Sequence, residues 1–170
     1  MALEILWSLA KEAELNLAEL LLAQTRRGQT AFHFAIYQFY AVGNRVELLQ
    51  KMCSWAEEAQ PNSNELKNKL LLAKDKYGYT VWHGAAASGN LEVLKMLWSW
   101  AKETELYPEK LLLAQSNRGE TAWYFAAKGN HLDVLQKLCV WAEEAQLNPN
   151  DLQRAERFGR LKAFWRRLRK

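Results

Sequence analysis

The side chains of this chain that could do chemistry are three histidines, two cysteines and several paired carboxylates. Zinc needs three or four converging nitrogen, sulfur or oxygen ligands, but no Cys-x-x-Cys, His-x-x-x-His or carboxylate cluster accompanies His33, His83 and His131. The sequence also has no nucleophile elbow, no phosphate-binding glycine loop and no His-Glu-x-x-His motif. We therefore expect no catalytic residues, no metal and no cofactor, and we predict that the protein is not an enzyme.

The histidines belong to a segment that occurs three times, LLAQTRRGQTAFHFA, LLAKDKYGYTVWHGA and LLAQSNRGETAWYFA, which aligns Gly28, Gly78 and Gly119. In the second copy, Thr80 can cap the N-terminus of a short Ala-rich helix, and Gly89 can end that helix in the left-handed conformation. A second helix follows each copy, with apolar residues at helical spacing. The sequence therefore predicts repeated turn-helix-turn-helix units, and stacking would bury their apolar faces.

This pattern resembles the ankyrin repeat, whose signature is a glycine turn, T-P-L-H-x-A-A and a second turn containing glycine. The matching residues of the second copy, with Val81 in place of the Pro and Trp82 in place of the Leu, are Thr80, Val81, Trp82, His83, Ala85, Ala86, Gly89 and Asn90. The resemblance implies an all-α solenoid of helix-turn-helix repeats. It also implies that His33 and His83 hydrogen-bond the backbone of a neighbouring turn, with Tyr124 at the equivalent place in the third repeat.

The repeats are longer than usual, because Gly78 and Gly119 are 41 residues apart and an ankyrin repeat takes about 33. We expect the second helix to continue to about Thr104 and a short apolar flap to follow, with Pro108 in the first turn of a short helix. The third repeat is one residue short, so its first helix should end early. Residues 1–151 are then a repeat array, made of a half-repeat at 1–20 with a lone second helix and repeats at about 21–69, 70–110 and 111–151. Either the half-repeat is a cap, or the sequence is a piece of a longer array.

Cysteines and tryptophans follow the same period, which favours structural roles. Cys53 and Cys139 lie two repeats apart, which is roughly 20 Å for helices stacked at 8–10 Å, and a disulfide needs Cα atoms within about 7 Å. We expect buried free thiols and a reducing compartment. The recurring aromatic residues are predicted to be core rather than a ligand cage or a nucleic-acid stacking surface. They are Phe32, Trp82 and Trp123 on the first helices and Trp55, Trp100 and Trp141 on the second. We expect Trp55, Trp100 and Trp141 to pack under the flaps against Leu106 or Leu147.

Ankyrin repeats bind other proteins through their turn tips and the exposed side of their first helices, so the resemblance implies a protein partner here. The matching positions are Arg26, Arg27, Gln29, Lys76, Tyr77, Tyr79, Asn117, Arg118 and Glu120 on the turns, and Ala87, Ser88 and Lys128 on the first helices. The inserted residues Tyr37, Phe39 and Tyr40 are further candidates, because the repeat template gives them no place in the core. A merely solvated edge is the alternative.

The positive charge of the chain is concentrated in residues 152–170, which contain eight Lys or Arg residues and one Glu. Apolar residues from Phe158 to Leu168 follow helical spacing, so we expect a basic amphipathic helix. We favour a capping helix that closes the last repeat. The competing function is binding of an anionic membrane or nucleic acid through Arg166, Arg167, Arg169 and Lys170.

Targeting signals are not evident in the sequence. No apolar run approaches the roughly 18 residues of a membrane span, and the acidic, amphipathic N-terminal stretch is unlike a signal peptide. We expect an intracellular protein, cytoplasmic or nuclear.

Overall fold

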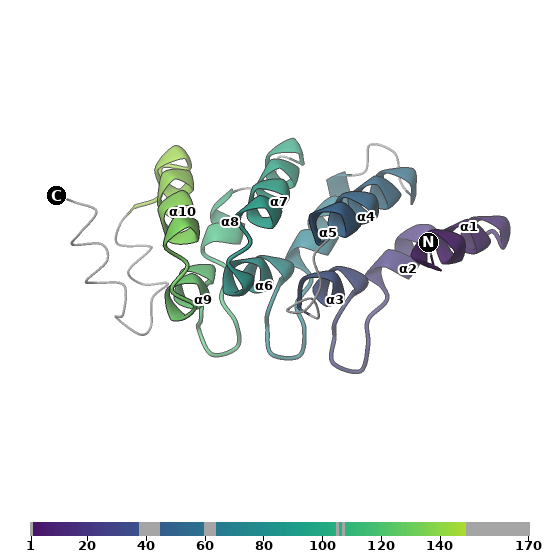
Figure 1. Cartoon of the computed structure of the whole chain (residues 1–170), viewed down its shortest axis with the longest axis horizontal. Coiled ribbons are helices and arrows are strands. Elements are labelled where there is room, and N and C mark those ends of the chain that lie inside the picture. The colour runs from purple at the N-terminus through teal and green to yellow at the C-terminus, as the bar shows by residue number, and fades with distance from the viewer. Residues whose placement is uncertain (1, 38–44, 60–63, 105, 107, 149–170) are drawn as a thin grey trace.

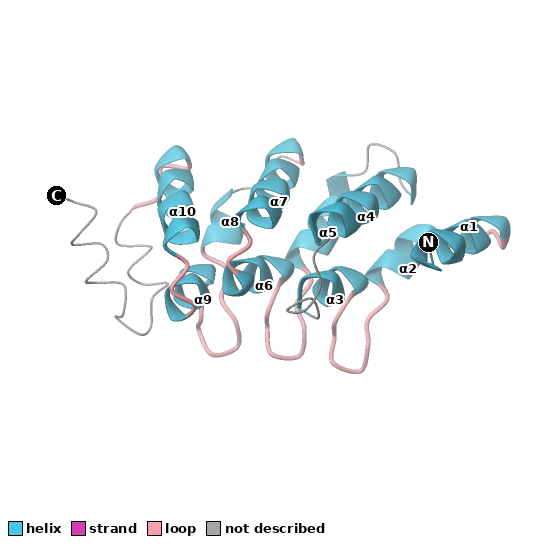
Figure 2. Ribbon diagram, viewed as in Figure 1, coloured by secondary structure: helices cyan, strands magenta, loops and turns pink. Residues whose placement is uncertain are grey.

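A computed structural model describes residues 2–37, 45–59, 64–104, 106 and 108–148. This part of the chain is all-helical and forms no strand, which confirms the predicted all-α class (Figures 1 and 2). The expected helix over residues 152–170 and the candidates Phe39 and Tyr40 lie outside the described residues. The helices are α1 (Ala2–Glu12), α2 (Leu17–Leu22), α3 (Ala31–Tyr37), α4 (Arg45–Ala59), α5 (Asn64–Leu72), α6 (Val81–Ser88), α7 (Leu91–Glu103), α8 (Pro108–Leu112), α9 (Ala122–Lys128) and α10 (Leu132–Glu144).

Three kinds of helix alternate along the chain after α1. We call α3, α6 and α9 the first helices, α4, α7 and α10 the second helices, and α2, α5 and α8 the flap helices. The first helices lie side by side in a row, with α6 in contact with both α3 and α9. One flap helix, the first helix after it and the second helix after that make up a set: α2–α4, α5–α7 and α8–α10. Within each set the flap helix packs against the second helix, as α5 does against α7. Figure 1 shows the three sets in sequence order, with α1 beside the first of them.

The element boundaries follow the local sequence signals. Gly28, Gly78 and Gly119 all have positive φ values, of 72°, 80° and 75°, as the turns require. Helix α7 ends at Glu103, and α8 begins at Pro108, so the lengthened second helix and the short flap helix are confirmed. Helix α9 has seven residues against eight in α6, as the missing residue predicts.

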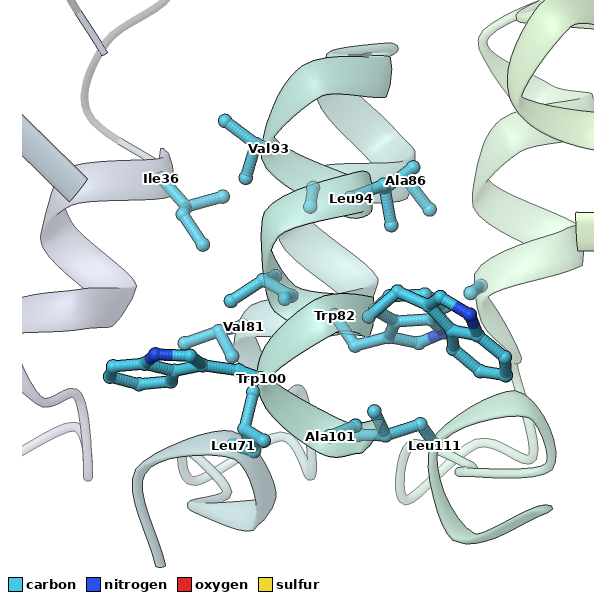
Figure 3. Packing of buried hydrophobic residues seen from close by; sticks show 14 of the residues in the cluster. Ile36, Leu71, Val81, Trp82, Ala86, Val93, Leu94, Trp100, Ala101 and Leu111 are labelled. Atoms are coloured by element: carbon cyan, nitrogen blue, oxygen red, sulfur yellow. The ribbon is translucent and has the colours of Figure 1, made fainter. Parts of the chain in front are cut away.

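The core is built mostly of leucine and alanine and includes a ladder of aromatic side chains between adjacent sets. Phe32, Trp82 and Trp123, one from each first helix, are buried as predicted. Trp100 and Trp141 are buried too, whereas Trp55 is only half-buried. Figure 3 shows Trp82 and Trp100 within this packing, on opposite sides of a second helix.

The aromatic ladder joins the first helices α3 and α6 to the next set, which the sequence did not predict. The ring centroids of Phe32 and Trp100 are 5.7 Å apart, and those of Trp82 and Trp141 are also 5.7 Å apart. These contacts, rather than contacts with the flaps alone, explain the period of the tryptophans. Offset and tilted aromatic pairs at such separations add stability beyond the area that they bury.

The two cysteines are free and buried, as predicted. Burial raises the pKa of the Cys53 thiol to about 12, so the protonated thiol persists at neutral pH. No helix in the described part of the chain has both the length and the apolar character to cross a membrane.

Candidate interaction surface

Three turns project from one edge of the molecule, ahead of α3, α6 and α9 (Figure 2). The second turn is closed by Asp75, whose Oδ1 accepts hydrogen bonds of 2.9 Å from the backbone N–H groups of Tyr77 and Tyr79. In the other two turns, Thr25 and Ser116 occupy the same place, and their hydroxyl oxygens accept the equivalent backbone bonds. These three residues hold each turn in shape from within.

Neighbouring turns are joined by their backbones. Lys76 N donates to Arg27 O at 2.8 Å, and Asn117 N donates to Tyr77 O at 2.9 Å. The approach is close, because a Cβ atom on Gly78 would lie 2.5 Å from Asn117 Oδ1. The turns therefore form one continuous row.

The predicted role of the histidines is confirmed. His33 and His83 are buried, and their Nδ1 atoms accept from the backbone N–H groups of Thr30 and Thr80 at 3.2 and 3.1 Å. Because Nδ1 accepts, Nε2 carries the hydrogen and donates to the carbonyl oxygens of Tyr79 and Ala114 in the following turns, both at 3.0 Å. Burial lowers the pKa of His83 to about 4. Each ring is thus a neutral tie between one first helix and the next turn.

His131 makes a further tie between sets. Its Nε2 lies 3.1 Å from Ala87 O at the end of α6. Among the residues that the structure describes, no three His, Cys, Asp or Glu side chains are grouped so that they could hold a metal ion.

The structure brings most of the predicted binding residues to one edge. Six of those on the turns have exposed side chains: Arg26, Arg27, Lys76, Tyr77, Asn117 and Arg118. Lys128, at the end of α9, is also exposed. Four others are half-buried, namely Gln29, Tyr79, Ala87 and Ser88. Tyr37 is the last residue of α3, and Arg166, Arg167, Arg169 and Lys170 lie outside the described residues.

Glu120 corrects the expectation that every turn-tip position is exposed, because its side chain is buried at 7% exposure. One carboxylate oxygen, Oε2, accepts from Tyr79 OH at 2.9 Å and from Ser116 Oγ at 3.1 Å. Tyr79 is occupied by the same bond and packs edge-on against Phe125, with ring centroids 5.3 Å apart. Both side chains therefore make contacts within the molecule that support the turns.

Sequence reasoning missed the turn-closing residues and the inward position of Glu120. A signal for the first exists, because Thr25, Asp75 and Ser116 each stand three residues before the turn glycine, and such side chains favour local bonds to the backbone. Nothing in the glutamate's own position predicts its burial, which depends on the tyrosine hydroxyl of the preceding turn.

The exposed charges of the turn row are all positive. They are Arg26, Arg27, Lys74, Lys76 and Arg118, whereas the acidic residues of the same turns, Asp75 and Glu120, are both buried and hydrogen-bonded. Tyr77 adds an aromatic ring that is 50% exposed, with Lys76 Nζ 4.7 Å from its centroid. We call the exposed side chains of Arg26, Arg27, Lys76, Tyr77 and Arg118 the turn-tip row.

A scan against protein-family models gives no match for this chain, and a search of the curated proteins gives none either.

Proposed function

We propose that this protein is a non-enzymatic interaction module of ankyrin-like repeats, and that it binds a protein partner along the turn-tip row. The observation that carries the proposal is that two groups of side chains around the turns differ in orientation. Asp75, His33 and His83 face inward and bond the backbone, and Glu120 is buried against Tyr79 and Ser116. The arginine and lysine side chains and the ring of Tyr77 are left in solvent. The last three residue types offer large contact area and directional hydrogen bonds, and arginine and tyrosine dominate the binding energy of many interfaces.

The charge of the turn-tip row favours a partner segment that carries carboxylates. Arg27 and Arg118 stand on different turns of the row, so an acidic segment lying along the edge could meet guanidinium groups at more than one turn. Arginine binds carboxylates through two parallel hydrogen bonds. Tyr77, between them, supplies an aromatic surface for the apolar part of such a segment.

The proposal is tested by charge reversal at the turn tips. Proteins captured by the immobilised chain from its native cells are identified and purified, and their affinities are measured by calorimetry. The double variant Arg27→Glu and Arg118→Glu is expected to weaken binding at least about tenfold, because two charge-assisted contacts become repulsive. The matched control reverses Lys95 and Lys102, exposed lysines of the second helix α7, and should bind like the unaltered chain.

Two results would contradict the proposal. Equal affinity of the turn variant and the unaltered chain would move the binding surface away from the turns, toward the second helices. Retention of nucleic acid or anionic vesicles that depends on residues 152–170, with no protein bound at the turns, would favour the competing function of the basic segment.

A further inference from the structure

The N-terminal end of the helix row contains an apolar groove of about 760 Å³. It lies among α1, α2, α3 and α4, and its walls include Leu6, Leu9, Trp7, Phe34, Met52 and Trp55. Leu6 and Leu9 are 61% and 52% exposed, although both belong to the apolar side of α1. Exposed leucines and almost wholly apolar walls make this groove a candidate docking surface.

Two tryptophans of this groove repeat an arrangement found elsewhere in the molecule. The rings of Trp7 and Trp55 are stacked at 4.9 Å with an interplanar angle of 14°. Trp98 and Trp141, at the matching places of later second helices, are stacked at 4.8 Å and 19°. The two pairs are therefore equivalent parts of the first and the last of the three junctions.

A third aromatic ring packs against Trp98 and Trp141. Among the described residues, no first helix supplies such a ring to Trp7 and Trp55. Trp82 of the first helix α6 lies against both rings, at 6.1 Å from Trp98 and 5.7 Å from Trp141, and is completely buried. A first helix also serves the middle junction, where Phe32 of α3 packs on Trp100. In the described part of the chain, no first helix precedes α1.

The start of helix α3 also lies uncovered at this position. Ala31, at its start, is exposed and lines the groove. The equivalent residues, Val81 in α6 and Ala122 in α9, are completely buried, and each of those helices packs on a preceding first helix. The groove thus continues the row of first helices by one position.

We propose that this groove binds a helix of the first-helix kind, which places an aromatic side chain over Trp7 and Trp55. The partner chemistry follows from α6: an aromatic residue, as at Trp82, with alanines three and four positions later, as at Ala85 and Ala86. Both alanines are completely buried, so small residues there let the helix approach closely. The occupant is therefore a short apolar helix with one aromatic anchor.

The proposal is tested by adding such a helix to the full chain. A copy of residues 73–91 is fused directly before Met1, which continues α1 in register because Trp7 then follows the copied turn as Trp98 follows the original. The matched control is the same fusion with alanine at the position copied from Trp82. We expect the tryptophan fusion to raise the melting temperature by roughly 5 °C or more and the alanine fusion to raise it by less than half as much.

Two further measurements locate the effect. Hydrogen exchange of the α1 amides should slow at least tenfold in the tryptophan fusion, and much less in the alanine fusion. Leu6→Glu puts a charge on the groove wall at an exposed position, so it should lower the melting temperature of the tryptophan fusion while barely changing that of the unfused chain.

Three outcomes would overturn the proposal. The first is an equal melting temperature and equal α1 exchange for both fusions. The second is a dimer of the unfused chain at micromolar concentration that Leu6→Glu dissociates, which would make the groove a contact between copies. The third is binding of a synthetic peptide of residues 152–170 to the unfused chain that Leu6→Glu abolishes, which would assign the groove to the basic segment.

Discussion

Acidification should destabilise this protein through its buried imidazoles, and His83 offers the clearest case. The ring is 1% exposed, accepts a hydrogen bond at Nδ1 and donates one at Nε2. The protonated ring would lose its acceptor, and burial disfavours the charge. The informative perturbation is His83→Gln, which keeps a hydrogen-bonding amide of similar reach and cannot titrate.

The size of the effect follows from the pKa of His83, which burial lowers from 6.5 to about 4. A tenfold change in proton affinity corresponds to about 1.4 kcal/mol, so the shift amounts to roughly 3 kcal/mol of stability. Above pH 6.5 both folded and unfolded chains hold a neutral ring, and this stability is fully present. As the pH falls from 6.5 toward 4, the unfolded chain takes up a proton before the folded one does, and the stability is lost.

The assay is urea unfolding followed by tryptophan fluorescence at a series of pH values between 7 and 4, at constant ionic strength. His83→Gln should be less stable than the unaltered chain at pH 7, by about 1–3 kcal/mol, because the amide cannot reproduce both buried bonds. It should lose roughly 3 kcal/mol less on acidification, so the two curves converge. His33, whose pKa burial also lowers, is present in both proteins and cancels in the comparison. Parallel stability curves over this pH range would refute the idea that His83 is buried as a neutral, hydrogen-bonded ring.

Three further predictions concern the core, the turns and the basic segment. Trp82→Ala should lower the free energy of unfolding by about 3–5 kcal/mol, because it removes a completely buried aromatic ring from the junction between sets. Lys76→Ala, on an exposed turn tip, should change it by less than about 0.5 kcal/mol. Equal urea midpoints for the two variants would show that Trp82 is not core. Gly78→Ala should destabilise by more than about 1 kcal/mol in the same assay, since φ is 80° and the new Cβ would lie 2.5 Å from Asn117 Oδ1, and unaltered stability would mean that the turns are not in contact. A chain ending at Asp151 should melt at a lower temperature if the basic segment caps the array, whereas an unchanged melting temperature with lost binding of anionic vesicles would instead make that segment a ligand-binding element.

The parts of the structure that the sequence predicted are those that recur with its period. Gly28, Gly78 and Gly119 occupy the same position of three equivalent turns, and a glycine repeated at one position indicates a backbone with positive φ. Likewise, His33 and His83 recur at one position, and a buried imidazole needs one donor and one acceptor. Local patterns of this kind specify a backbone without knowledge of the neighbours.

The parts that were missed depend on pairs of residues in different turns or sets. The burial of Glu120 requires the hydroxyl of Tyr79, which is 41 residues earlier in the chain. Likewise, the stacking of Trp7 on Trp55 becomes evident only when α1 and α4 are placed together. Periodicity predicts which positions are equivalent, but the partner of a particular side chain depends on residues that differ between the repeats.

The way in which neighbouring turns are joined has a consequence for how this surface can change. Lys76, Arg27 and Tyr77 connect the turns through backbone N–H and carbonyl groups, while their side chains remain exposed. Substitution of these side chains therefore leaves the bonds between turns in place. Asn117 is the exception, because its side chain also donates to Lys76 O and lies against Gly78. The edge is a fixed frame on which most tip residues can be exchanged, so new binding specificities are accessible to selection, or to a combinatorial library, at little cost in folding.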